Sequence, residues 1–264
     1  MQFHALDRYQ TGASFLHQLD PRVKVAGTVL LILATVLLPD GAWLAFLLTG
    51  LLLLAVSYAA GLGWLYAVKR SFVVLPFLLA AVTVMFSLPG RPLLGLQLGP
   101  WQLILTDAGV VRFASILLRS LLAVQAAILL VATTRFPDLM HALRHLHLPA
   151  VLVAIISFMV RYLTVLGDEV KRLLRAREAR SAAVAGRRAG GALIWRARVA
   201  GNMVGQLFLR SYERSDRIYQ AMLARGYQGE WPTGNAHQMK TRDWSALGIL
   251  LLALFVVQVV GRWK

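Results

Sequence analysis

An arginine-rich block from Asp168 to Arg242 constrains this chain more than any other feature. The block holds 15 of the 28 lysine and arginine residues in the 264-residue sequence but only six of the 12 acidic residues. Hydrocarbon cannot accept this density of charge, so the block must lie in water or at a membrane surface. Apolar stretches of spanning length flank it on both sides, and these predict membrane helices. We therefore expect a charged domain attached to a membrane anchor.

The composition is typical of a polytopic membrane protein. Hydrophobic residues make up 58% of the chain and cysteine is absent, which excludes a disulfide framework and a thiolate metal site. The net charge of +16 would also suit a nucleic-acid-binding protein. In a membrane protein, however, an excess of lysine and arginine in cytoplasmic segments accounts for it. We expect contact with the lipid bilayer and none with nucleic acid.

Five segments are predicted to cross the membrane, and the predicted fold class is an all-α polytopic membrane protein with long cytoplasmic or interfacial helices. The spans are Val23–Leu38, a helix within Gly41–Val68, Ser71–Leu88, Ala108–Thr133 and Trp244–Gly261. The stretch Pro89–Pro100 is expected to be a loop, because it is rich in proline and glycine and no β-type alternation of useful length is evident. The chain is thereby divided into a membrane domain (1–133), a cytoplasmic domain (134–242) and a last transmembrane helix (243–264).

The apolar stretch Pro149–Leu166 is a sixth candidate span, and charge decides against it. Arg161 interrupts it, whereas a span needs about 20 apolar residues. With five spans, the basic N-terminus and the loop at Lys69-Arg70 share the cytoplasmic side with the arginine-rich block. With six spans they fall outside, against the positive-inside bias. We therefore expect one long helix from Pro149 to about Val184, at or below the membrane surface.

Two triplets of small residues around an arginine lie in the block, Ala179-Arg180-Ser181 and Ala224-Arg225-Gly226. The first lies near the end of the long helix. The second ends a helix predicted over Ala192–Ala224, because Gly226 is a natural left-handed C-terminal cap. An arginine at such an end is exposed, complements the helix dipole and offers paired donors to an acidic groove. Basic helix ends are also common in cytoplasmic segments, so an ordinary solvated end stays open as the alternative.

Polar residues close to the spans have candidate structural roles. Asp20 can cap the first helix, with a proline at the first helical position, and Arg22 and Lys24 can hold that helix end at the head groups. In the fourth span, Arg112 and Arg119 lie two turns apart on one face, and an arginine that faces lipid is costly. Arg119 is therefore a candidate contact with a partner or with the cytoplasmic helices. Snorkelling toward the interface is the alternative.

The histidines are the candidates for a metal site. His141 and His145 are spaced i, i+4 beside His147, which is a metal-binding spacing. No cysteine supports such a site, and an amphipathic helix over Pro137–Leu146 explains the spacing equally well, so we predict no metal. The sequence also shows no phosphate-binding glycine-rich loop and no Ser-His-Asp or paired-carboxylate arrangement. We expect a chain that is not an enzyme, needs no cofactor and does not itself bind ATP.

Four segments occur in one order along the chain: Ser14–Lys24 at the start of the first helix, Thr133–Leu139 with Ala142-Leu143 after the fourth span, and the two arginine triplets. Together they resemble the transmembrane T component of energy-coupling factor transporters, the family that includes the cobalt-transport CbiQ proteins. Each motif is short, but the ordered set is specific. The resemblance covers essentially the whole chain.

The resemblance implies a mechanism. In this family the two triplets end coupling helices that dock in grooves of two ATP-binding-cassette ATPases, and the T component also grips a separate substrate-binding membrane subunit, the S component. ATP-driven motion passes through the coupling helices and topples that subunit. The implied location is the prokaryotic cytoplasmic membrane, and the implied cargo is a micronutrient, either a cobalt or nickel ion or a vitamin. Carried over onto this chain, the ATPase-docking residues are Ala179, Arg180, Ser181, Ala224, Arg225 and Gly226.

Two other functions stay open on the residues alone. A self-contained secondary transporter or channel would need intramembrane acids, matched broken helices or an inverted repeat, and none is evident. A lipid-modifying membrane enzyme could use the basic block to bind anionic head groups. It would need a catalytic base or a metal cluster near the interface, for which the histidines are the candidates.

The five-span topology predicts the sidedness of the loop at Lys69-Arg70. A cysteine placed at either position in this cysteine-free chain should react with a membrane-impermeant maleimide from the cytoplasmic side, because the loop carries positive charge. Labelling of intact cells and of inside-out vesicles shows from which side of the membrane the cysteine reacts. Reaction from the outside alone would contradict five spans.

Overall fold

The computed structural model describes residues 9–10, 12, 14–74, 76, 79, 81–98, 101–180, 193–229 and 239–263. The chain forms two compact units. The bundle unit comprises Asp7–Leu146 and Asn235–Lys264, and the helix-pair unit comprises Met1–Leu6 and His147–Gly234.

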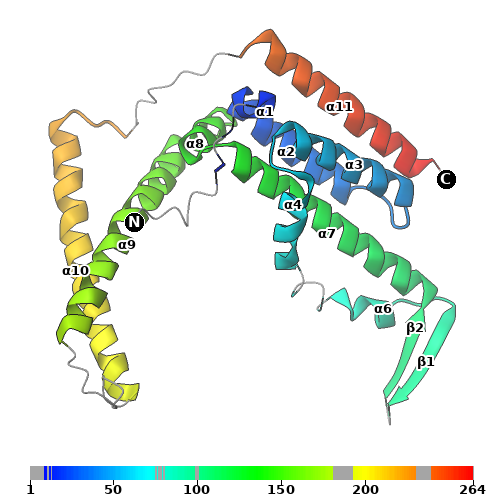
Figure 1. The fold of residues 1–264 in the computed structure, drawn as a ribbon, viewed down its shortest axis with the longest axis horizontal. Helices are drawn as coiled ribbons and strands as arrows, with labels where there is room; N and C mark the ends of the chain where they lie inside the picture. The colour runs from blue at the N-terminus through cyan, green and yellow to red at the C-terminus, as the bar shows by residue number, and fades with distance from the viewer. Residues whose placement is uncertain are drawn as a thin grey trace. The chain divides into compact units, whose positions relative to one another are not determined.

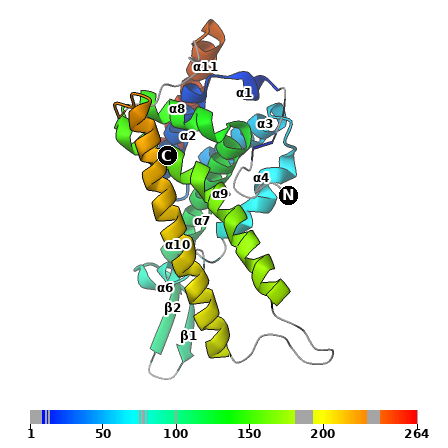
Figure 2. The same cartoon turned by 90° about the vertical axis from the view of Figure 1, so that its left-hand side faces the viewer.

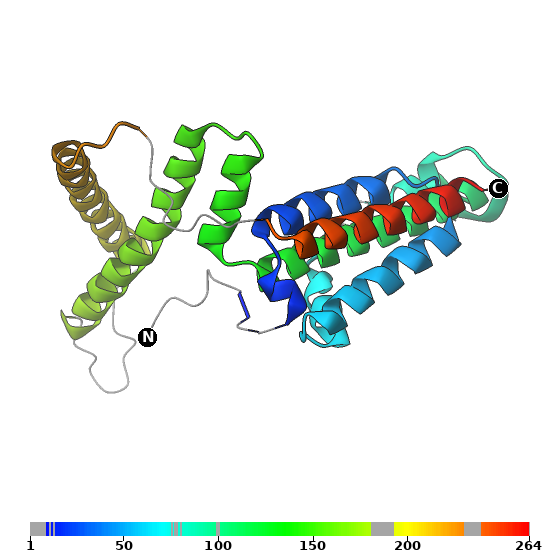
Figure 3. The same ribbon diagram turned by 90° about the horizontal axis from the view of Figure 1, so that it is seen from above.

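Four apolar helices make the core of the bundle unit: α2 (Pro21–Val36), α3 (Trp43–Ala59), α7 (Asp107–Thr133) and α11 (Thr241–Arg262). They lie side by side in Figure 3, with α2 packed against both α7 and α11. Small residues allow this close approach: a Cβ added at Gly261 would lie 2.6 Å from Leu38 Cδ2. The buried core comprises Leu31, Leu38, Ala42, Ala45, Phe46, Leu53, Leu122, Ala126, Leu129, Leu254 and Val257.

The outer faces of these four helices carry exposed apolar side chains. Leu47, Leu51, Leu252 and Phe255 are each more than half exposed, as suits a surface that contacts lipid. The four helices coincide with the predicted first, second, fourth and fifth spans, so those predictions are confirmed as helices. The helical membrane fold class is confirmed as well.

The start of α2 follows the predicted capping chemistry. The Asp20 carboxylate accepts a hydrogen bond from the Arg22 N–H at 2.9 Å, and Pro21 occupies the first helical position. Proline fits there because the first turn has no intrahelical partner for its missing N–H. A short helix, α1 (Phe15–Gln18), precedes this cap.

The predicted third span is wrong as a continuous helix. After α4 (Trp64–Arg70), the segment forms a 3₁₀ turn, η1 (Ser71–Val74), and a turn at Val82-Thr83 precedes the short α6 (Val84–Ser87). Pro76 lies within this stretch. Proline removes a helix hydrogen bond and clashes with the preceding turn, which explains why apolar composition alone overestimated the helix.

The expected loop at Pro89–Pro100 is also corrected. Strands β1 (Pro92–Leu98) and β2 (Trp101–Thr106) form an antiparallel hairpin, in which Leu96 lies opposite Leu103. Leucines at alternate positions of both strands supply the period of two that a strand requires. Thr106 then ends the hairpin and caps α7 by accepting a hydrogen bond from Gly109 N–H.

The arginine-rich block folds as two long helices, α9 (Ala150–Arg180) and α10 (Leu193–Ala224). The short amphipathic α8 (Phe136–His145) belongs to the bundle unit. Within the described part of the chain, α7, α9 and α11 are long and apolar enough to cross a membrane, and α3 is a shorter apolar helix. The number of spans, and the placement of α9 at the membrane surface, stay predictions.

Arg119 has an intramolecular partner at the far end of α2. Its Nη2 donates to Asp40 Oδ1 at 2.8 Å and to the Leu38 carbonyl, and Arg112 Nε lies 3.8 Å from Asp40 Oδ2. The Arg119 and Asp40 side chains are only 21% and 34% exposed. This ion pair gives Arg119 a structural role in the bundle, and contact with a partner subunit stays a prediction.

We predict that Asp40→Asn lowers the stability of the bundle by about 1–3 kcal/mol, because it leaves the half-buried Arg119 charge without its carboxylate. Thermal unfolding of the purified protein in detergent measures the loss. Adding Arg119→Met should recover part of it, because the uncompensated charge is then removed as well. An unchanged melting temperature for Asp40→Asn would contradict this role.

Candidate functional site

Helices α9 and α10 pack as an antiparallel pair within their own unit (Figure 1). The Glu169 carboxylate of α9 forms an ion pair with Arg172 of the same helix at 2.9 Å. It forms a second with Arg210 of α10 at 3.0 Å, which joins the two helices. The Glu169 side chain is 17% exposed, so this contact is the best-shielded charge pair between the two helices. One carboxylate therefore fixes where the two helices cross.

Arg225 directly follows the last residue of α10 and is exposed. Gly226 adopts a φ of 80°, a left-handed conformation that favours glycine. Its N–H donates to the Leu223 carbonyl at 2.9 Å, and Tyr227 N–H donates to the Met222 carbonyl at 3.0 Å. These two bonds form the Schellman motif that ends many helices. The predicted cap is confirmed, and it presents Arg225 at the tip of α10.

Arg180 is the last residue of α9, and both it and Ala179 are exposed. Ser181, the third residue of the first triplet, lies outside the described residues. Neither Arg180 nor Arg225 forms an ion pair with any described carboxylate, whereas Arg172 and Arg210 of the same helices do. Among the described residues, both triplet arginines therefore lie at a helix end without a carboxylate partner.

The C-terminal ends of α9 and α10 lie at opposite ends of the helix pair (Figure 2). The first half of α9 and the second half of α10 line one common cleft. Arg225 therefore lies at the cleft end of the pair, and Arg180 lies at the other end. At 1.5 Å per residue, Arg180 is about 16 Å along α9 from Glu169, and Arg225 is about 22 Å along α10 from Arg210. The geometry separates the two tips widely enough for two distinct contacts.

The helix pair buries almost none of its own apolar surface. Val153 is the one buried residue among the described residues of α9, and none is buried in α10. The cleft between them has a volume of about 570 Å³, and sequence reasoning did not identify it. Exposed apolar side chains of this density are typical of an interaction surface. Aromatic residues dominate the lining: Phe158, Tyr162, Phe208, Tyr212, Tyr219 and Tyr227.

Two of the three candidate histidines, His141 and His145, lie in the bundle unit and contact Arg22. The Nε2 atoms of His141 and His145 are 3.2 Å and 2.6 Å from Arg22 Nη2. A guanidinium can only donate, so both imidazoles accept from it. No group of three or more histidine, cysteine or carboxylate side chains in the described parts of the chain could hold a metal ion. The i, i+4 spacing serves a contact between α8 and α2.

The N-terminal segment is held by a neutral histidine. His17 Nδ1 lies 2.6 Å from Ser14 Oγ, and its Nε2 lies 3.0 Å from the Gln10 carbonyl. Burial lowers the pKa of His17, because desolvation disfavours the charged ring. The ring therefore joins Ser14 and Gln10 without adding charge to an already basic region.

Comparisons with known proteins give one matching family and several relatives. The CbiQ family, described as cobalt transport protein, matches residues 12–241. The energy-coupling factor transporter transmembrane protein EcfT of Acidaminococcus fermentans is 28% identical over 271 residues, covering 98% of this chain and 96% of that protein. The cobalt transport protein CbiQ of Salmonella typhimurium is 32% identical over 181 residues, covering 66% and 78%. The nickel permease LarQ of Lactiplantibacillus plantarum is 31% identical over 126 residues, covering 47% and 43%.

The family match takes in α2, α3, α7 and both arginine triplets, within one continuous range of residues. The chain therefore belongs to the CbiQ family, the transmembrane T components of energy-coupling factor transporters.

Proposed function

We propose that this chain couples two ATP-binding-cassette ATPases to a substrate-binding membrane subunit, and that Arg180 and Arg225 are the two ATPase contacts. The observation that carries the proposal is the pair of exposed helix tips, each with an arginine that has no described carboxylate partner. Their position on opposite sides of the α9–α10 crossing suits one ATPase at each tip. The chain itself performs no catalysis, and ATP hydrolysis belongs to the partners.

The chemistry of arginine fits this role. A guanidinium stays charged and offers a planar fork of donors that pairs with a carboxylate through two hydrogen bonds. The alanines at positions 179 and 224 leave each tip slim, so a groove can close around it. A Schellman cap fixes the direction of the Arg225 tip, which reduces the entropy lost on docking.

The apolar faces of α9 and α10 are proposed to receive the substrate-binding membrane subunit. Leu209 and Tyr212 on α10 are 62% and 68% exposed, and Ile155 on α9 is 56% exposed. An apolar surface of this kind in a basic domain requires a protein or membrane partner to cover it. The two arginine tips and the apolar faces between them would then bind different subunits at the same time.

The proposed cargo is a divalent cobalt or nickel ion. One relative is named a cobalt transport protein and another a nickel permease. The separate membrane subunit would select the ion, because the described residues of this chain show no group of three potential metal ligands.

We predict that Arg180→Ala and Arg225→Ala each weaken ATPase association, and that the double change abolishes it. Truncating one partner of a desolvated charge pair costs about 2–5 kcal/mol, and one intact tip should retain part of the binding. Lysine at both positions should restore little, since it lacks the planar fork. Pull-down of the ATPases from detergent-solubilised membranes measures association, and ion uptake by cells measures function.

The matched control removes two charges from the same helices away from their tips. Arg175 and Arg198 are exposed positions on α9 and α10, so the Arg175→Ala, Arg198→Ala double variant lowers the net charge equally. It should keep its ATPases. Normal ATPase recovery and uptake with the Arg180→Ala, Arg225→Ala variant would overturn the docking role.

A further inference from the structure

The chain passes between the helix-pair unit and the bundle unit at three places, and two of them flank the segment that holds α9 and α10. It leaves the bundle after Leu146, one residue beyond the last turn of α8, and returns at Asn235, shortly before α11 begins. Movement of α9 and α10 can reach the bundle through the chain at these two places. The contacts made there by α8 and by the start of α11 decide which span moves.

The start of α11 is bonded to the turn that begins α2. Asp243 is 3% exposed, and its Oδ1 accepts a hydrogen bond from Asp20 N–H at 3.0 Å while its Oδ2 accepts one from Lys240 N–H at 2.9 Å. The Arg242 guanidinium also donates to the Gln18 carbonyl at 3.1 Å. Asp243 thus joins the first turn of α11 to the residue that caps α2.

The last turn of α8 is bonded to the same turn of α2. The Arg22 guanidinium contacts the imidazoles of both His141 and His145, and its Nε lies 3.9 Å from Asp20 Oδ1. Both connections to the helix-pair unit therefore meet at Asp20 and Arg22, two residues apart in the sequence. We call Asp20, Arg22, His141, His145 and Asp243 the junction.

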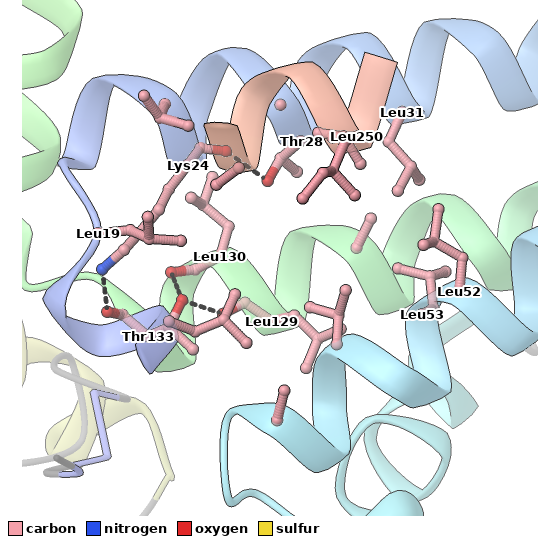
Figure 4. Close-up of a pocket in the computed structure, with 18 of the residues that line it drawn as sticks. Leu19, Lys24, Thr28, Leu31, Leu52, Leu53, Leu129, Leu130, Thr133 and Leu250 are labelled. Carbon is pink, nitrogen blue, oxygen red and sulfur yellow. Dashed lines mark hydrogen bonds between the residues drawn. The ribbon is translucent and has the colours of Figure 1, made fainter. Parts of the chain in front are cut away.

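A cavity beside the junction leaves polar contacts to hold the helices together at this level. Its volume is about 410 Å³, and mainly aliphatic side chains of α2, α3, α7 and α11 line it (Figure 4). Lys24 bridges its edge by donating to the Thr133 carbonyl of α7 at 3.1 Å. The Lys24 bond therefore adds a polar contact between α2 and α7 at the edge of this cavity.

We propose that the junction transmits movement of α9 and α10 to α2, with Asp243 and Arg22 as the positioning residues. The two connections enter from different helices and bond to one turn, so they would displace the end of α2 together. The proposal rests on the proposed function, since it takes the ATPases to be the source of the movement. It assigns coupling to residues that touch neither an ATPase nor the transported ion.

The test uses the complete transporter in proteoliposomes, with single spin labels on cysteines introduced into the cysteine-free chain. One label replaces the exposed Gln206 on α10, and the other replaces the exposed Val29 on α2. Electron paramagnetic resonance spectra are compared without nucleotide and with ATP plus vanadate. Without junction changes, both labels should respond to nucleotide.

With Asp243→Asn, the α10 label should keep its response, and the α2 response should fall about fivefold or more, the lower range of measured allosteric couplings. His145→Ala, which alters an exposed side chain and leaves the core intact, should weaken the α2 response in the same direction. Arg22→Lys should also weaken the α2 response, since an ammonium cannot span both imidazoles as the guanidinium does. ATPase co-purification should stay unchanged in all three variants.

The matched control is Asp40→Asn, which disrupts a charge pair at the opposite end of α2. It should lower stability and leave the α2 response intact. A full α2 response with both Asp243→Asn and His145→Ala would overturn the role proposed for the junction. The same holds if only the α10 label responds in a chain without junction changes. An unmodified chain in which the α10 label does not respond instead refutes the ATPase coupling proposed above.

Discussion

The ion pair between Glu169 and Arg210 joins α9 and α10, which share no fully buried core of their own. Apart from Val153, no described residue of α9 or α10 is buried, so hydrophobic burial within the pair contributes little. A single shielded carboxylate, shared by Arg172 and Arg210, sets the crossing. Two helices without a shared core can change their angle at low cost, which suits the movement proposed for them.

The bundle unit has the opposite construction. Its core runs continuously through α2, α3, α7 and α11, and small residues such as Gly261 bring the helices close together. Charge pairs occur at both ends of α2, with Asp40 and Arg119 at one end and the junction at the other. The apolar middle resists deformation, so a force applied at one end of α2 would move the helix as a body.

Local chemistry predicted much of this fold from the sequence. Asp20 before Pro21 identified the start of α2, and Gly226 identified the end of α10, because caps depend on neighbouring residues. The third span was overestimated, since apolar composition outweighed Pro76. The hairpin was missed, although alternate leucines marked both strands. The proline and glycine residues of Pro89–Pro100 were interpreted as a loop, although part of this stretch forms strand β1.

The junction could not be predicted from any local pattern. Asp20 and Asp243 lie 223 residues apart, and Arg22 lies 119 and 123 residues from the two histidines it contacts. Such pairs follow from the packing of α8 and α11 against α2, and the i, i+4 histidines had suggested a metal. The arginine tips were found because each triplet lies at a predicted helix end, and Gly226 supplies the cap of α10.

The most direct test of the central claim is crosslinking from the alanine beside each arginine. Cysteines at Ala179 and Ala224, carrying a photoactivatable maleimide, leave both guanidinium groups in place. In the assembled transporter each position should crosslink to an ATPase, and the doubly labelled chain should capture two ATPase subunits at once. Capture of a single ATPase by the doubly labelled chain, or crosslinks from both positions to the membrane subunit or lipid alone, would contradict the account.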